Sequence, residues 1–187
     1  GSLAASLMGS SKVNFFHEHV LVKEPQTEEP TPWHHDQPYW VVDGTQVCSI
    51  WIPLDPVARD VCVQFIAGSH RWGKWFTPKS FSTSANHDSN EGDSLPDIAD
   101  LQANNEVLTW DMEPGDCIAF HALTLHGAPG NRSSTQRRRA IAMRFTGDDA
   151  TFTRRDGYMS PPFESVDLTP GDPMDSEHFP IVYDARA

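Results

Sequence analysis

Short stretches of alternating hydrophobic and polar residues run along this chain and predict β-strands separated by turns. Residues 12–23 are rich in Val and Phe. The odd-numbered positions from Phe15 to Lys23, with His17 and His19 among them, would share one face, because side chains alternate along a strand. Further strands are predicted at residues 45–54, 61–66, 106–110, 117–125 and 137–145.

Helical patterns are scarce in the chain. Residues 3–8 followed by Gly9 predict the last turns of a helix with a glycine stop. This helix follows directly on Gly1 and Ser2, which have the composition of a tag remnant, so we expect an N-terminal portion of the protein to be absent from the sequence. The polar segment 77–105 is low in apolar residues and predicts an insertion or a lid rather than core.

The spacing of the strands predicts a mainly β fold, a double-stranded β-helix (a cupin-like jelly roll) with a few flanking helices. A Rossmann-type fold is disfavoured, because strands and helices do not alternate and the glycine fingerprint is missing. We expect a single domain over residues 1–187 with its core at about 12–146. Residues 147–187 hold many prolines, glycines and acids, so they are expected to wrap or cap that core.

Composition narrows the range of partners. Asp plus Glu number 26 against 14 Lys plus Arg, and the resulting net charge of −12 disfavours nucleic acid and anionic membrane surfaces as partners. No apolar run reaches membrane-spanning length. Cys48, Cys62 and Cys117 lack metal-binding or redox spacing and are flanked by Val or Ile, which predicts buried thiols in the reducing cytoplasm. The sequence leaves the oligomeric state open.

Two histidines and one carboxylate are spaced so that they can hold a metal ion. His34 and Asp36 lie two apart in WHHDQPYW. An extended strand would point both to one face and direct His35 away, toward solvent or a backbone carbonyl. His126 follows a Pro-Gly-Asp turn and a predicted strand, and it can add a third ligand from a distant part of the chain. Such a triad suits non-haem Fe(II) and leaves coordination positions open for a cosubstrate and O2.

Further motifs accompany this triad. Asn131 and the arginines of RRRAI follow His126, and the combination resembles the phytanoyl-CoA dioxygenase family of Fe(II)- and 2-oxoglutarate-dependent oxygenases, which includes ectoine hydroxylases. The resemblance extends over residues 12–145. It rests on VLVKEP, WHHDQPYW, SIWIPLD, the Gly-Ser-His turn and PGDCIAFHALTLHG taken together.

The resemblance implies a double-stranded β-helix that holds Fe(II) by His34, Asp36 and His126, with 2-oxoglutarate and O2 at the open positions. The distal carboxylate of 2-oxoglutarate needs a buried cation with two-point geometry, which arginine supplies best. The family position for this arginine is Arg138. Arg137 is its rival, because the loop is one residue longer than in some relatives.

Other positions match residues that line the family's cavity. Lys23 matches a lysine that faces the cosubstrate pocket, although a solvated lysine at a strand end is the alternative. Gln37 and Trp51 also match cavity positions, and simple core packing is the alternative for Trp51. Ala128 stands where many relatives have a serine that helps to hold the 2-oxo acid, so one hydroxyl donor is lost here.

The expected activity is hydroxylation of a small molecule, coupled to the conversion of 2-oxoglutarate to succinate and CO2. Asp36 argues against halogenation, because related halogenases have a small residue at that position. One alternative is a nucleic-acid oxidative demethylase, whose arginine spacing Arg138 and Arg144 fit, but the net charge of −12 counts against it. Another is non-enzymatic: a jelly-roll binding module that keeps a metal for stability, or a cupin-like zinc protein. The acidic surface favours a neutral or cationic substrate over a CoA thioester.

Overall fold

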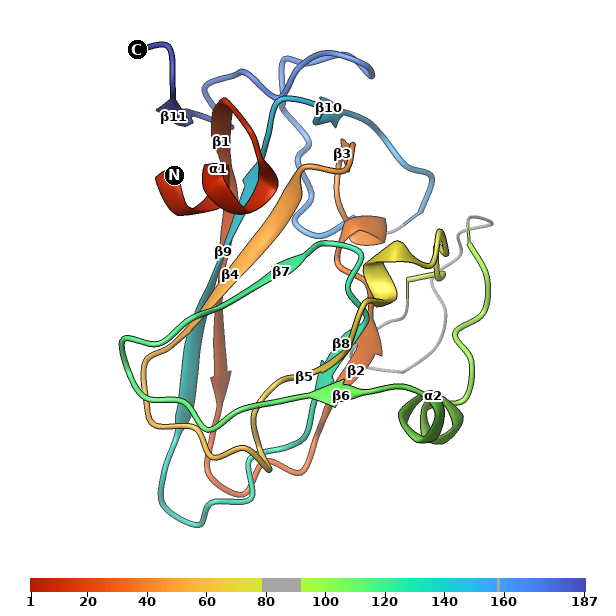
Figure 1. Ribbon diagram of the computed structural model, residues 1–187, viewed down its shortest axis with the longest axis vertical. Coiled ribbons are helices and arrows are strands. Elements are labelled where there is room, and N and C mark those ends of the chain that lie inside the picture. The colour runs from red at the N-terminus through yellow and green to blue at the C-terminus, as the bar shows by residue number, and fades with distance from the viewer. Residues whose placement is uncertain (79–91, 158) are drawn as a thin grey trace.

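The computed structural model describes residues 1–78, 92–157 and 159–187 and shows a mainly β molecule (Figure 1). In order across the larger, five-stranded sheet lie β11 (Ile181–Asp184), β1 (Lys12–Lys23), β9 (Arg138–Thr146), β4 (Val47–Pro53) and β7 (Ile118–His121). Across the smaller, four-stranded sheet lie β2 (Thr31–His34), β8 (His126–Ala128), β5 (Gln64–Ile66) and β6 (Val107–Leu108). A two-stranded sheet pairs β10 (Thr151–Phe152) with β3 (Val42–Asp43).

The chain passes repeatedly between the two larger sheets. β1, β4, β7 and β9 belong to one sheet, while β2, β5, β6 and β8 belong to the other. This alternation winds the strands around a common interior, and the predicted double-stranded β-helix is confirmed. Its short helical elements are α1 (Ser2–Met8), α2 (Ile98–Asn104), and the 3-10 turns η1 (Gln37–Tyr39) and η2 (Ser69–Arg71). Within the described residues, neither α-helix has the length and apolar character needed to cross a membrane.

Strand β9 forms the centre of the larger sheet, hydrogen-bonded to β1 on one side and β4 on the other. Its alternate residues face the interior, and the two in the middle are alanines, which leave space for a cavity there. On β1, Lys23 lies opposite Arg138 and His17 lies opposite Arg144. The four inward residues are Arg138, Ala140, Ala142 and Arg144.

Several predicted elements differ from the observed ones at their ends. The helix before Gly9 and the strand at residues 12–23 are confirmed as α1 and β1, and Gly9 has a φ of 64° that suits glycine. The strand predicted at residues 117–125 instead ends at His121, where Thr124 donates a backbone hydrogen bond to His121. That turn lets the chain leave the larger sheet, so that His126 begins β8 in the smaller one.

The segment predicted as a polar insertion or lid, residues 77–105, is described only in part. Residues 79–91 lie outside the described residues. The rest contains α2, whose N-terminus is capped by the Asp97 carboxylate. Leu101 of α2 is buried against Ile66 and Leu125. This part is therefore packed on the smaller sheet, and none of its described residues lines the cavity.

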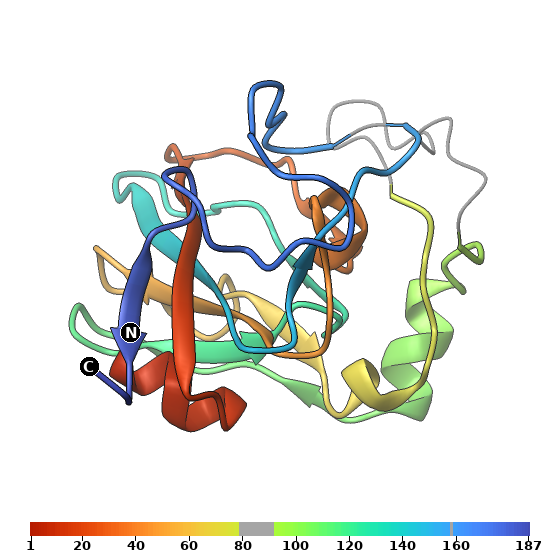
Figure 2. The ribbon, with the colours of Figure 1, turned by 90° about the horizontal axis from the view of Figure 1, so that it is seen from above.

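The C-terminal segment, blue in Figures 1 and 2, lies across one end of the sheets and finishes beside α1. Phe152, Met174 and Phe179 from this segment are buried with Phe16 of β1 in one cluster. The packed interior therefore extends beyond the core range of about 12–146 expected from the sequence pattern. The pattern did not show this, because isolated apolar residues among prolines and acids have no regular period.

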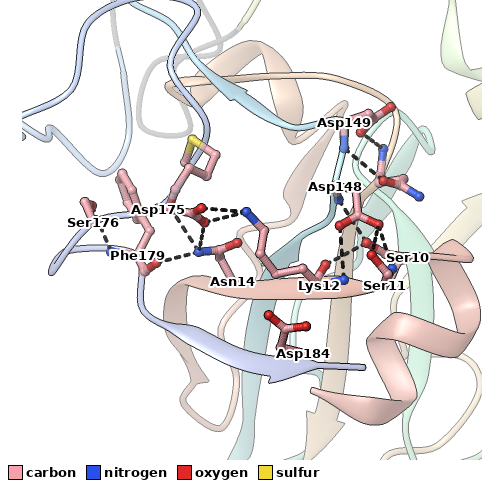
Figure 3. Close-up of polar contacts among 12 residues, drawn as sticks. Ser10, Ser11, Lys12, Asn14, Asp148, Asp149, Asp175, Ser176, Phe179 and Asp184 are labelled. Atoms are coloured by element: carbon pink, nitrogen blue, oxygen red, sulfur yellow. Dashed lines mark hydrogen bonds and ion pairs between the residues drawn. The ribbon is translucent and has the colours of Figure 1, made fainter. Parts of the chain in front are cut away.

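Polar contacts near the start of β1 hold the C-terminal segment in place (Figure 3). Asp175 accepts hydrogen bonds from Lys12 Nζ at 2.6 and 2.7 Å and from Asn14 Nδ2 at 3.0 Å. The Asn14 amide is fully buried and also donates to the carbonyls of Phe179 at 2.8 Å and Met174 at 3.2 Å. These bonds fix the segment against the strand whose other half forms a wall of the cavity.

Candidate metal centre and cavity

The structure brings His34, Asp36 and His126 together between the two sheets. Their ligand atoms all lie within 4.8 Å of one another, and the three side chains are buried. Asp36 Oδ1 lies 3.4 Å from His34 Nε2 and 3.8 Å from His126 Nε2. The strand register explains the approach, because His34 at the end of β2 is paired with His126 at the start of β8.

The convergence of His34 and Asp36 has a different local cause from the one expected. The sequence predicted one extended strand through both residues, but β2 ends at His34 and Asp36 has helical dihedral angles at the start of η1. Pro38 favours this tight turn, and the Asp36 backbone N–H donates to the Ala122 carbonyl at 2.9 Å. The turn, rather than strand alternation, directs the carboxylate toward the imidazoles.

His35 occupies a different position from the predicted one. It was expected to point toward solvent or a backbone carbonyl, but only 1% of it is exposed and its ring lies 4.9 Å from that of Phe76. Burial, followed by the neighbouring His126 and His34, lowers the pKa of His35 to about 3. Neither ring nitrogen has a hydrogen-bond partner among the described residues. His35 is therefore a neutral ring in the packing behind the triad.

Backbone carbonyls set the tautomers of the two histidines of the triad. His34 Nδ1 lies 2.7 Å from the Pro32 oxygen, and His126 Nδ1 lies 2.9 Å from the Thr124 oxygen. A carbonyl only accepts hydrogen bonds, so Nδ1 carries the proton in each ring and a neutral ring presents the lone pair of Nε2. Burial and the facing His34 lower the pKa of His126 to about 4, which keeps this ring neutral near pH 7.

The Asp36 carboxylate uses its two oxygens differently. Oδ1 faces the imidazoles, while Oδ2 accepts a hydrogen bond from Ser49 Oγ at 3.2 Å and lies 4.0 Å from Arg144. Burial raises the pKa of the Asp36 carboxyl, but the facing His126, Arg144 and His34 outweigh burial and hold that pKa well below its usual range. Asp36 is therefore ionised, with one oxygen held by the protein and the other directed at the histidines.

A cavity of about 840 Å³ opens beside the triad and is lined by residues of both larger sheets. His34 and His126 contribute to one wall, and the inward residues of β1 and β9 form another. Ser160 and Pro161 of the C-terminal segment also line it. The cavity falls within the range of roughly 300–1,000 Å³ that small-molecule sites occupy.

Arg138 and Lys23 lie at one end of this cavity, where the last residue of β1 is paired with the first residue of β9. Both side chains donate to the Pro129 carbonyl, Arg138 at 3.2 Å and Lys23 at 3.1 Å, and Arg138 also donates to the Val61 carbonyl. Burial, followed by the charge of Arg138, lowers the pKa of Lys23 to about 8. Arg137 is exposed instead and pairs with Glu24 at 2.9 Å, so of the two rival arginines the structure brings only Arg138 to the cavity.

The remaining predicted positions separate into lining and non-lining residues. Trp51 and Ala128 line the cavity, and Trp51 is also packed in a core cluster with Ala142. Gln37 does not line it. Only 2% of the residue is exposed, and its amide donates to the Gly44 carbonyl at 2.9 Å, so Gln37 contacts the loop after η1.

Two residues beside Asp36 were not predicted as site residues. Arg144 lies six residues after Arg138 on one strand, so their shared face was readable from the sequence, but the spacing suggested only a rival family. Ser49 gave no signal, because its approach to Asp36 depends on the pairing of β4 with β9 and on the turn at η1.

The donor set fits a ferrous ion. Two imidazole nitrogens and one carboxylate oxygen, gathered on one wall of a cavity, are the ligands of non-haem Fe(II), and zinc accepts the same donors. The fold and the site together define a class, the double-stranded β-helix proteins with a two-histidine, one-carboxylate metal centre. Residues 2–140 match the family described as Phytanoyl-CoA dioxygenase (PhyH). The chain belongs to this family.

Individual relatives are distant and longer. The chain is 24% identical over 157 residues to a "Probable phytanoyl-CoA dioxygenase" of Caenorhabditis elegans, covering 76% of this chain and 46% of that protein. It is 33% identical over 115 residues to the "1-deoxypentalenic acid 11-beta-hydroxylase" of Streptomyces arenae, covering 58% of this chain and 38% of that protein. The chain therefore spans less than half the length of these curated relatives.

A solved structure gives the same fold. The crystal structure of the epimerase SnoN in complex with Fe3+, alpha ketoglutarate and nogalamycin RO superposes with a TM-score of 0.70 at 24% identity, covering 96% of this chain and 68% of that one. At this level of identity the similarity establishes the fold alone.

Proposed function

We propose that the protein is an Fe(II)- and 2-oxoglutarate-dependent dioxygenase that hydroxylates a small molecule. The observation that carries the proposal is the meeting of two features in one cavity. The triad of His34, Asp36 and His126 lies on its wall, and the cation pair of Arg138 and Lys23 lies at one end. A metal site that served only stability would have no need of the cation pair.

The chain's own residues have separate roles in this proposal. The triad would hold Fe(II), with the tautomers of the histidines fixed by the Pro32 and Thr124 carbonyls. Arg138 would bind the distal carboxylate of 2-oxoglutarate, and Lys23 would add a second charge beside it. When bound, iron with 2-oxoglutarate and O2 supplies the chemistry that converts a C–H bond to C–OH and yields succinate and CO2.

The relatives support the choice of cosubstrate and substrate class. SnoN is described with Fe3+ and alpha ketoglutarate bound, and the Streptomyces arenae relative is named as a hydroxylase of a small carboxylic acid. The cavity volume of about 840 Å³ suits a compound of this class. Proposed partners are therefore small molecules, with neither nucleic acid nor membrane among them.

The test of this function is cosubstrate binding at the metal. Fe(II) and 2-oxoglutarate, added anaerobically, are expected to give the visible absorption band of the chelate. Arg138→Gln should weaken 2-oxoglutarate binding strongly and leave the iron content unchanged. Arg137→Gln is the matched control, because it removes the same charge one residue away on the surface. Stoichiometric iron without the band would favour the non-enzymatic metal module instead.

A second measurement separates the enzyme classes. Succinate release that rises with candidate small molecules, and stays at its basal rate with methylated oligonucleotides, is the expected result. The opposite response would support the nucleic-acid demethylase.

We also propose a cytoplasmic location. Cys48, Cys62 and Cys117 are all free thiols, which is typical of proteins in a reducing compartment. Cys117 differs from the expectation from sequence, because it is exposed while the other two are buried.

A further inference from the structure

Arg144 is a buried cation whose hydrogen-bonding capacity is mostly unused. Only 6% of the residue is exposed, and it lines the cavity beside the triad. Within the described part of the chain, the guanidinium donates one hydrogen bond, to the Ala142 carbonyl at 3.3 Å, and it packs 5.3 Å from the ring centre of Trp40. Its Nε has no hydrogen-bond partner among the described residues. An arginine offers five N–H donors, so a buried one normally has several acceptors around it.

Asp36 does not account for these donors. The nearest Arg144 nitrogen lies 4.0 Å from Asp36 Oδ2, which is beyond hydrogen-bonding distance. Ser49 Oγ lies closer, at 3.2 Å, and donates to that same oxygen. Arg144 therefore contributes charge to the environment of Asp36 while its donors remain available to a molecule in the cavity.

The charge in the cavity also calls for an anion. The charged residues that line it are Glu18, Lys23, Asp36, Arg138 and Arg144, and of the two carboxylates only Asp36 is buried. In the proposed function the ferrous ion and the 2-oxoglutarate dianion cancel each other, so the three cationic side chains exceed the two carboxylates by one charge. Arg138 and Lys23 face the cosubstrate. Arg144 is then the cation left for the substrate.

The histidine opposite Arg144 does not change this balance. His17 lies opposite Arg144 in the pairing of β1 with β9 and also lines the cavity. Burial, followed by Arg144, lowers its pKa to about 3, so the ring is neutral near pH 7. The rest of the wall beside Arg144 is largely apolar, with Trp40, Phe120 and Ala142 among its residues.

We propose that Arg144 binds a carboxylate of the substrate, and that the substrate is an otherwise apolar small carboxylic acid whose charged group lies beside the metal centre. This inference rests on the proposed function. It differs from the preference for a neutral or cationic substrate drawn from the net charge of −12, because the side chains around a cavity, and not the whole surface, decide what binds inside it.

The test compares acids with their amides. The protein, loaded anaerobically with Fe(II) and saturating 2-oxoglutarate, is titrated with hexanoate, octanoate and cyclohexanecarboxylate and with the three corresponding primary amides. Perturbation of the chelate absorption band reports binding and shows that 2-oxoglutarate stays in place. At least one acid is expected to bind about tenfold or more tightly than its amide, because a hydrogen bond to a charged group is the stronger kind.

Variants then assign the preference to Arg144. Arg144→Gln should retain the band and bind acid and amide alike. Arg139→Gln, on the outer face of the same strand, removes the same charge and should keep the preference. If Arg144→Gln loses iron, Arg144→Lys is tested instead, because lysine keeps a cation near Asp36 but offers only a single-point contact. The preference of this variant for an acid over its amide should be at least about threefold smaller than that of the wild-type protein.

The outcomes distinguish this inference from the proposed function. Failure of the wild-type protein to form the chelate band would reject the proposed function, and this inference with it. A band with no binding of any acid, or with equal binding of acids and amides, would reject the carboxylate site alone. An undiminished preference in an iron-loaded Arg144 variant would do the same.

Discussion

The affinity for 2-oxoglutarate should depend on pH through Lys23. Burial and the charge of Arg138 lower the pKa of this lysine to about 8, whereas a bound carboxylate would raise that pKa again. Below about pH 8 Lys23 is already protonated, so the affinity is expected to be constant. Above that value binding must be accompanied by proton uptake, and the affinity falls as pH rises toward the pKa of the bound state.

The size of this effect follows from the position of the pKa. With a pKa of about 8 in the free protein and a value near the ordinary one in the complex, the dissociation constant should be about tenfold higher at about pH 9 than at about pH 7. Tenfold corresponds to about 1.4 kcal/mol of binding free energy. His17 and His35 have pKa values of about 3 and His126 of about 4, so these histidines do not titrate in this interval.

Calorimetric titration of the Mn(II)-loaded protein with 2-oxoglutarate, at constant ionic strength across this interval, measures the effect. Lys23→Met should bind more weakly at the lower pH and show a flat profile. A wild-type profile that is flat within about twofold, or an equally steep profile in Lys23→Met, would refute the assignment of Lys23 to the cosubstrate.

Three further outcomes are expected from variants. Gln37→Leu should leave the affinity for 2-oxoglutarate unchanged. It should lower the free energy of unfolding, measured by denaturant titration, by about 1–3 kcal/mol, because the Gly44 carbonyl loses its buried donor. Weaker cosubstrate binding at full stability would contradict this prediction. Ser49→Ala should weaken iron binding by about tenfold or more in competition with a chelator, since Oδ2 of Asp36 loses its hydrogen bond; unchanged affinity would show that the bond is dispensable. Asn14→Ala should lower the free energy of unfolding by about 1–3 kcal/mol, because the buried carbonyl of Phe179 is left unpaired. Unaltered thermal unfolding would contradict the conclusion that these bonds fix the C-terminal segment against β1.

The extent to which the sequence predicted the fold varied along the chain. β1 and α1 were predicted almost to the residue, because long alternation and a glycine stop are local signals. The buried residues of the C-terminal segment, such as Phe152 and Phe179, were not predicted as core. Their burial depends on a long return of the chain across the sheets, which leaves no period in the sequence.

The site shows the same division. His34, Asp36 and His126 were named from residue type and spacing, because metal binding restricts which side chains can serve. The pair at residues 137 and 138 was named from the family resemblance. The family position already favoured Arg138 over Arg137, and in the structure only Arg138 of the two lines the cavity, since a shift of one residue in a strand reverses the face of a side chain.

The sequence by itself determined the donors of the candidate centre, the family and the mainly β fold of the chain. Only the tertiary structure decided how those donors are held. The turn at Asp36, the hydrogen bond from Ser49, the burial of His35 and the unused donors of Arg144 all arise where segments far apart in the chain meet. Cross-strand register and packing set such contacts, and neither is encoded in any short stretch of residues.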